Sequence, residues 1–238
     1  MEAVFGSDSA LTSRGGAKKT LKLLSRLRRR AGKVRDLDVQ IRLLRGLKMP
    51  EETRRKSELL RLLTDERAQR DQKLRKAFSR DVIAELRKQL KRVCRKIDDG
   101  WDPAQEAFLS ATQLAQIVGP ITEETLHQYR ILGKRVRYLA ELAEDNPEAV
   151  RMVDILRKMQ DVIGDWHDWL KLTERAEEKF GTPRDAHLVA ALRNITQAKY
   201  RQSLVEVEEA RSELGTPAVP SRKASADRMA RATSVAAA

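Results

Sequence analysis

Prolines and glycines are sparse in this chain of 238 residues, and they fall between long segments with helical periodicity. In residues 17–47 the apolar side chains recur at intervals of three and four, which makes one apolar face on a helix. Residues 51–97 contain neither proline nor glycine, so they predict one very long helix or two helices with an unmarked break. Aromatic residues make up only 4%, which argues against a β-sandwich or barrel. We therefore predict an all-α fold.

Capping residues mark the ends of the later helices. Asp102-Pro103, Thr122 and Asn146-Pro147 each stand before a periodic segment, and Thr182-Pro183 precedes the last one. Gly119-Pro120 is the clearest break near the middle of the chain. We accordingly predict a flexible N-terminal segment (1–16), a first helical bundle (17–118), a second helical bundle (119–214) and a disordered basic tail (215–238).

A weak repeat relates the two halves. The stretch LSRLRRRAGKVRDLDV, from Leu24, aligns with LRKMQDVIGDWHDWLK, from Leu156, so that Gly32 falls on Gly164. In the same register Arg35-Asp36 falls on His167-Asp168. Internal symmetry of this kind predicts two pseudo-symmetric antiparallel helical bundles. The helix that begins at His127 has no counterpart in the first half, so we expect the first bundle to lack its opening helix.

The charge of the chain points to an anionic partner. Its net charge is +13 and its isoelectric point is about 10.1. On a helical wheel the basic side chains form two rows, one containing Lys18, Lys22, Arg26, Arg29 and Lys33 and the other His127, Arg130, Lys134 and Arg137. Like charges at i and i+4 repel one another, and a bound polyanion relieves that repulsion. The alternative for each row is an ordinary solvated surface.

Motifs that carry catalysis or bind metal are missing from the sequence. It has no glycine-rich phosphate loop, no Ser-His-Asp arrangement and no isolated carboxylate pair, so we expect neither an enzyme nor a cofactor. His127 and His167 lack partners at metal-ligand spacing, so we predict no metal site, although an Mg²⁺ that accompanies a phosphate chain is left open. His167 suits two roles equally, a donor to phosphate or a partner in a structural hydrogen bond.

Two further features concern the setting of the chain. A single cysteine, Cys94, cannot form an intrachain disulfide, and this favours a reducing, cytoplasmic location. No segment contains the roughly 20 apolar residues that a membrane span needs.

With these patterns identified, the chain resembles the CHAD domain, the conserved histidine α-helical domain. The family's His-x-x-Arg-Ile-x-x-Lys-Arg-Leu-Arg-Tyr pattern is matched from His127 to Tyr138, with Val136 in place of leucine. Its Arg-Asp-Leu-Asp-Val segment is matched from Arg35, and its Gly-x-x-His-Asp segment from Gly164. The resemblance implies two four-helix bundles around a basic central channel that binds inorganic polyphosphate, and association with polyphosphate granules.

The resemblance also extends the set of candidate residues. The polyanion-binding residues then comprise the two rows above together with Arg35, Arg135, Tyr138 and His167. We expect the groove left by the missing opening helix to be filled by the N-terminal segment or by a second subunit in a homodimer. Two other functions remain open from the residues: a nucleic-acid-binding protein, which the low aromatic content makes less favoured, and a helical scaffold for an acidic partner.

Overall fold

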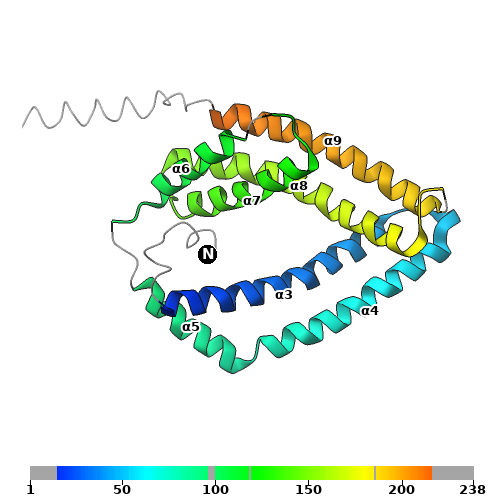
Figure 1. The fold of residues 1–238 in the computed structure, drawn as a ribbon, viewed down its shortest axis with the longest axis horizontal. Helices are drawn as coiled ribbons and strands as arrows, with labels where there is room; N and C mark the ends of the chain where they lie inside the picture. The colour runs from blue at the N-terminus through cyan, green and yellow to red at the C-terminus, as the bar shows by residue number, and fades with distance from the viewer. Residues whose placement is uncertain (1–14, 96–99, 118, 185, 216–238) are drawn as a thin grey trace, which may run out of the picture.

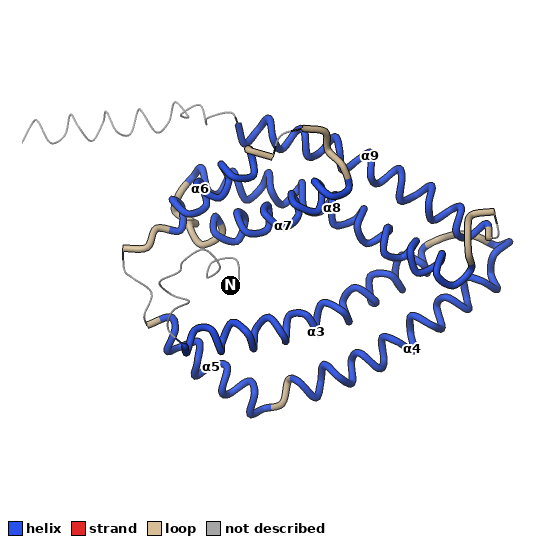
Figure 2. Tube along the Cα trace, viewed as in Figure 1, coloured by secondary structure: helices blue, strands red, loops and turns tan. Residues whose placement is uncertain are grey.

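The computed structural model describes residues 15–95, 100–117, 119–184 and 186–215. Within these ranges the chain is all-α and contains no strand. Its elements are α3 (Gly15–Gly46), the short 3-10 helix η1 (Pro50–Glu52), α4 (Thr53–Ala77), α5 (Arg80–Cys94), α6 (Pro103–Ala115), α7 (Glu123–Ala140), α8 (Pro147–Phe180) and α9 (His187–Gly215). Figures 1 and 2 show their arrangement. The predicted N-terminal segment and tail lie outside the described residues, apart from Gly15, Gly16 and Gly215.

Local sequence determines most of the helix ends. Thr122 and Asn146 cap α7 and α8 as predicted, and the Asn146 side chain accepts hydrogen bonds from the backbone N–H groups of Glu148 and Ala149 at 3.0 and 3.1 Å. The segment 51–97 forms two helices rather than one, because Ser79 caps α5 by accepting from the backbone of Val82. The last helix begins later than predicted, at His187, because a bend and a turn occupy residues 182–184.

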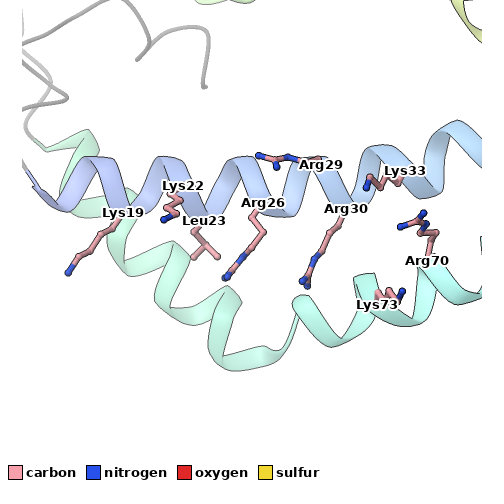
Figure 3. A pocket seen from close by; sticks show the side chains of 9 residues that line it. All are labelled: Lys19, Lys22, Leu23, Arg26, Arg29, Arg30, Lys33, Arg70 and Lys73. Carbon is pink, nitrogen blue, oxygen red and sulfur yellow. The ribbon is translucent and has the colours of Figure 1, made fainter.

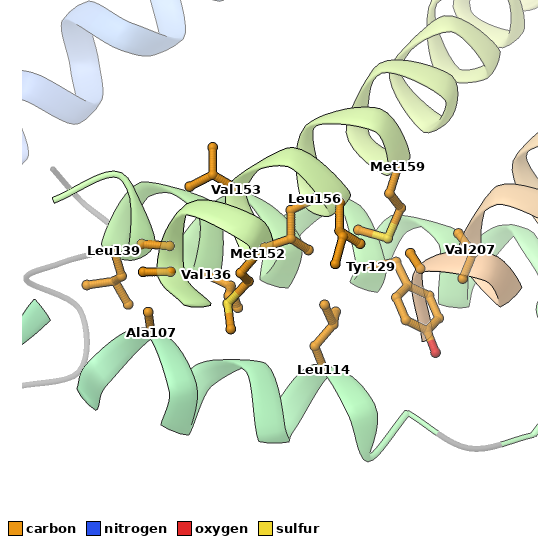
Figure 4. Close-up of a cluster of buried hydrophobic side chains, with 14 of the residues drawn as sticks. Ala107, Leu114, Tyr129, Val136, Leu139, Met152, Val153, Leu156, Met159 and Val207 are labelled. Carbon is orange, nitrogen blue, oxygen red and sulfur yellow. The ribbon is translucent and has the colours of Figure 1, made fainter. Parts of the chain in front are cut away.

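Two apolar cores hold the helices together. The larger core lies among α6, α7, α8 and α9, and Figure 4 shows part of it around Leu156 and Met159. The second core joins α3 and α4 to the later part of α8 and the beginning of α9. Helices α8 and α9 therefore take part in both cores, and the two run side by side in Figures 1 and 2.

This packing corrects the predicted division at residue 119. That boundary separates α6 from α7, yet the two helices pack against each other, and Ala107 and Leu114 of α6 are fully buried in the larger core. Burial of those apolar surfaces stabilises α6 in the second bundle, at about 25 cal/mol per Å² removed from water. The first unit therefore consists of α3, α4 and α5, closed at one end by α8 and α9.

The two aligned glycines, Gly32 and Gly164, lie within the long helices α3 and α8. A Cβ added to either of these two glycines would meet no atom within 4 Å. Gly133 in α7 is different, because a Cβ there would lie 2.7 Å from the Met159 side chain of α8. Glycine at this position therefore leaves room for the Met159 side chain against α7.

Candidate anion-binding site

Helix α7 presents its basic row beside a fully buried apolar face. Leu126, Tyr129, Val136 and Leu139 are at most 1% exposed and pack in the larger core, as the helical wheel predicts. The Tyr129 hydroxyl donates a hydrogen bond to the carbonyl of Ile117 at 3.1 Å, which ties α7 to the end of α6. With this face fixed against the core, the side chains of Arg130, Lys134 and Arg137 lie at its edge and are half-buried.

Lys134 is the centre of a cluster of charges from three helices. Burial lowers the pKa of its ammonium to about 8, and the positive charges of Arg130, Arg35 and Arg137 lower it further, while Asp168 of α8 acts in the opposite direction. We call these five residues the Lys134 cluster. It brings Arg35 of α3, the three cations of α7 and one carboxylate of α8 into a single electrostatic environment, in which cations outnumber the acid.

Three arginines of α7 have hydrogen-bond donors that nothing in the described part of the chain satisfies. The Nε atoms of Arg130, Arg135 and Arg137 are buried and have no hydrogen-bond partner. The nearest carboxylate, that of Glu141, stands 3.7 Å from Nη1 of Arg137. A buried donor without an acceptor costs about 1–3 kcal/mol, more for a charged group. An anion at this face would supply the missing acceptors.

Each of the two repeated motifs contributes one residue to the cluster, Arg35 from the first and Asp168 from the second. Arg35 Nη1 lies 3.7 Å from Asp36 Oδ1, and His167 Nδ1 lies 3.7 Å from Asp168 Oδ1. Neither distance is short enough for a hydrogen bond. His167 Nδ1 is buried and finds no acceptor among the described residues, so the structural hydrogen bond considered for this residue does not form there.

The other predicted residues of the α7 region are more exposed. His127 is exposed near the start of α7, and the Tyr138 side chain is 38% exposed, with its ring centroid 5.0 Å from the Arg137 guanidinium carbon. Both lie on α7, the helix that carries three of the five residues of the Lys134 cluster.

The basic row of α3 lies elsewhere. A cavity of about 540 Å³ between α3 and α4 is lined by Lys22, Arg26, Arg29 and Lys33 of that row (Figure 3). Lys18 is exposed and does not line this cavity. No residue of α7 or α8 lines this α3–α4 cavity. Arg35 is thus the residue of α3 that the structure brings to Lys134. The structure therefore divides the single predicted site into two surfaces.

Four cavity residues were not predicted. Lys19, Arg30, Arg70 and Lys73 complete its lining together with Leu23. Arg70 has an acidic partner in its own helix, because it hydrogen-bonds Glu66 at 3.1 Å. Lys73 differs, because it has no acidic partner in the described chain. A search for cations without an acid at i±3 or i±4 would have found it, since those positions are Gln69, Arg70, Lys76 and Ala77.

The described residues were also compared with what a metal site and a membrane-spanning helix require. No group of three or more His, Cys, Asp or Glu side chains in the described ranges is arranged to hold a metal ion. None of the helices described here is both long and apolar enough to cross a membrane.

The match to a known family decides what kind of domain this is. A family model for the CHAD domain matches residues 9–177. The chain belongs to the CHAD domain family. The match contains the whole Lys134 cluster and all of α3 to α7, and it ends before α9, although α9 contributes Leu192 and Val207 to the two cores of this CHAD domain. No curated protein and no solved structure matches the chain.

Proposed function

We propose that this CHAD-domain protein binds inorganic polyphosphate at the Lys134 cluster and catalyses no reaction on it. The observation that carries the proposal is the environment of Lys134, a half-buried ammonium beside three arginines and one carboxylate. Such an arrangement is destabilising in the free protein and becomes favourable when an anion supplies negative charge. Binding of this kind is also what the family resemblance implies, as is association with polyphosphate granules.

The chemistry of the side chains supports a phosphate chain as the ligand. Guanidinium groups donate two parallel hydrogen bonds to phosphate oxygens, and the unsatisfied Nε atoms of Arg130, Arg135 and Arg137 are donors of this type. A polymer engages several such groups at once, which raises its affinity without a deep pocket. Nucleic acid fits less well. Stacking on several bases needs several exposed aromatic side chains, and α7 exposes one, Tyr138.

The test compares two triple variants that lose the same charge. In the site variant Arg130, Lys134 and Arg137 are replaced by alanine, and in the control variant the exposed Arg54, Arg61 and Arg201 are replaced. Each lost charge-assisted hydrogen bond is worth about 1.5–3 kcal/mol, so the site variant should bind long-chain polyphosphate at least ~100-fold more weakly. The control should lose only a few-fold, through the reduced overall charge.

Salt dependence gives a second readout. The slope of log K against log salt should decrease in magnitude by about 0.7 for each phosphate contact that the site variant loses. Site and control variants that bind alike would overturn the proposal. So would duplex DNA that displaces polyphosphate at equal phosphate concentration, since this would favour a nucleic-acid function, and so would release of orthophosphate from the bound polymer by the purified protein.

A further inference from the structure

The α3–α4 cavity is basic on both of its walls. Eight basic side chains line it, six from α3 and two, Arg70 and Lys73, from α4. In Figure 3 Lys19, Arg26 and Arg30 extend from α3 toward α4. We propose that this cavity is a second anion-binding site, which takes a short linear oligophosphate independently of the Lys134 cluster. This inference goes beyond the proposed function, because it concerns a different surface.

The pattern of ion pairs in the cavity leaves its charge available to a ligand. Among the described residues Arg70 is the lining cation with an acidic partner, and that partner, Glu66, also pairs with Arg175 of α8 at 2.9 Å. Burial opposes ionisation of Glu66, but hydrogen bonds from Arg175 and Arg70 outweigh it and lower the pKa of the carboxyl. Glu66 therefore stays charged and holds Arg70 in place, while the other seven cations have no acid beside them in the described chain.

The dimensions of the cavity suit a short phosphate chain. Its volume of about 540 Å³ falls within the roughly 300–1,000 Å³ range of small-molecule sites. Lys19 and Lys33 stand about 21 Å apart along α3 at 1.5 Å per residue, so the cations are distributed along a line rather than around a point. Leu23 adds a half-buried apolar wall, and low-dielectric walls strengthen the field of the cations within the cavity.

The cavity and the Lys134 cluster share no residue. Arg35 is the part of α3 that reaches Lys134, and it is not in the cavity lining. Residues of α7 and α8 are also missing from that lining. A short anion in the cavity therefore has no contact with the cluster, and the two sites should be separable by mutation.

Tripolyphosphate is a suitable probe, because it fits within the cavity and is too short to bridge distant surfaces. Isothermal titration should give two bound equivalents for the wild type. The cavity variant, Arg26→Ala with Arg30→Ala and Lys73→Ala, should retain one equivalent and bind the other at least tenfold more weakly. The site variant of the Lys134 cluster should keep the equivalent that belongs to the cavity, whatever happens at the cluster.

The replaced cavity side chains are exposed, so the variant is expected to fold, and an unchanged thermal midpoint checks this. A conservative variant, Arg26→Lys with Arg30→Lys, keeps the charge and should retain both equivalents. Three results would overturn the inference: a cavity variant that binds like the wild type, loss of all binding in both triple variants, or a cavity that binds duplex DNA but no tripolyphosphate. If only the proposed function failed, the site variant would bind tripolyphosphate like the wild type. The cavity variant would still lose the bound equivalent of tripolyphosphate that belongs to the cavity.

Discussion

The guanidinium of Arg35 in α3 lies close enough to the ammonium of Lys134 in α7 to help lower its pKa to about 8, together with burial and two arginines of α7. These two cations come from different halves of the chain, and α8 packs against both helices that carry them. Their proximity is unfavourable in the free protein. It therefore links the charge state of one lysine to both binding and stability.

Polyphosphate affinity should fall as the pH rises from 7 to 9.5. In this interval the free protein loses the proton of Lys134, whose pKa is about 8, whereas its ordinary pKa is 10.5. Bound anion favours the protonated form, so binding above pH 8 requires proton uptake and weakens. Titrations at constant ionic strength measure this effect. Lys134→Arg keeps the charge throughout the interval, so its affinity should be nearly independent of pH, and a parallel fall in this variant would contradict the assignment.

The free energy of unfolding of the free protein should change with pH in the opposite direction, and Lys134 should again be the cause. Because the pKa of Lys134 is lowered on folding, the unfolded chain binds more protons between about pH 8 and 10.5, and the free energy of unfolding rises with pH in that window. Lys134→Gln removes this contribution. The variant should therefore melt at a higher temperature than the wild type at pH 7, and the difference should shrink toward pH 10. A difference that stays constant over this range would rule out the lowered pKa.

The arrangement within α7 was predictable, whereas the assignment of the α3 row was not. The angular positions of Tyr129, Val136 and Arg130 follow from 3.6 residues per turn, so sequence alone separates the apolar face from the basic row. The same projection cannot say which neighbour a face meets. Arg26 and Arg35 are both basic residues of α3, yet one lines the cavity beside α4 and the other reaches Lys134, and this depends on how α4 and α8 pack around α3.

Residues outside a periodic pattern were also beyond prediction. Arg30 lies off the predicted row but borders the cavity, because α4 approaches α3 on that side. The boundary at Gly119 was misplaced for a related reason. Glycine and proline mark a break in the chain, but Leu114 before the break and Leu126 after it are buried in one core. Whether two helices share a core depends on long-range packing that local signals do not contain.

Alanine at Gly133 and alanine at Gly164 should have opposite effects on the free energy of unfolding. The new methyl group of Gly133→Ala meets Met159, and this overpacking costs about 1–3 kcal/mol. The gain of about 1 kcal/mol that alanine has over glycine inside a helix offsets part of it, so the net loss should be at most about 2 kcal/mol. Gly164→Ala places its methyl group in open space and reduces the flexibility of the unfolded chain, so it should stabilise by about 0.5–1 kcal/mol. Urea denaturation of both variants measures the two effects, and destabilisation by Gly164→Ala would show that this part of α8 is more tightly packed than described.

The buried hydroxyl pair of Thr173 and Thr196 should respond asymmetrically to replacement by valine. Their Oγ1 atoms lie 2.8 Å apart between α8 and α9, and the Thr173 hydroxyl donates to the Trp169 carbonyl at 2.9 Å. Since one hydroxyl has one proton, Thr196 must be the donor within the pair. Thr173→Val leaves that donor without its acceptor and should lower the free energy of unfolding by about 1–3 kcal/mol.

Thr196→Val leaves Thr173 with its bond to Trp169, so it should cost only about 0.5–1 kcal/mol. The double variant removes both polar groups and should lose less stability than the two single variants added together. Urea denaturation of the three proteins forms a complete double-mutant cycle. A larger loss in Thr196→Val than in Thr173→Val would mean that the pair is oriented the other way, with Thr173 donating to Thr196 rather than to Trp169.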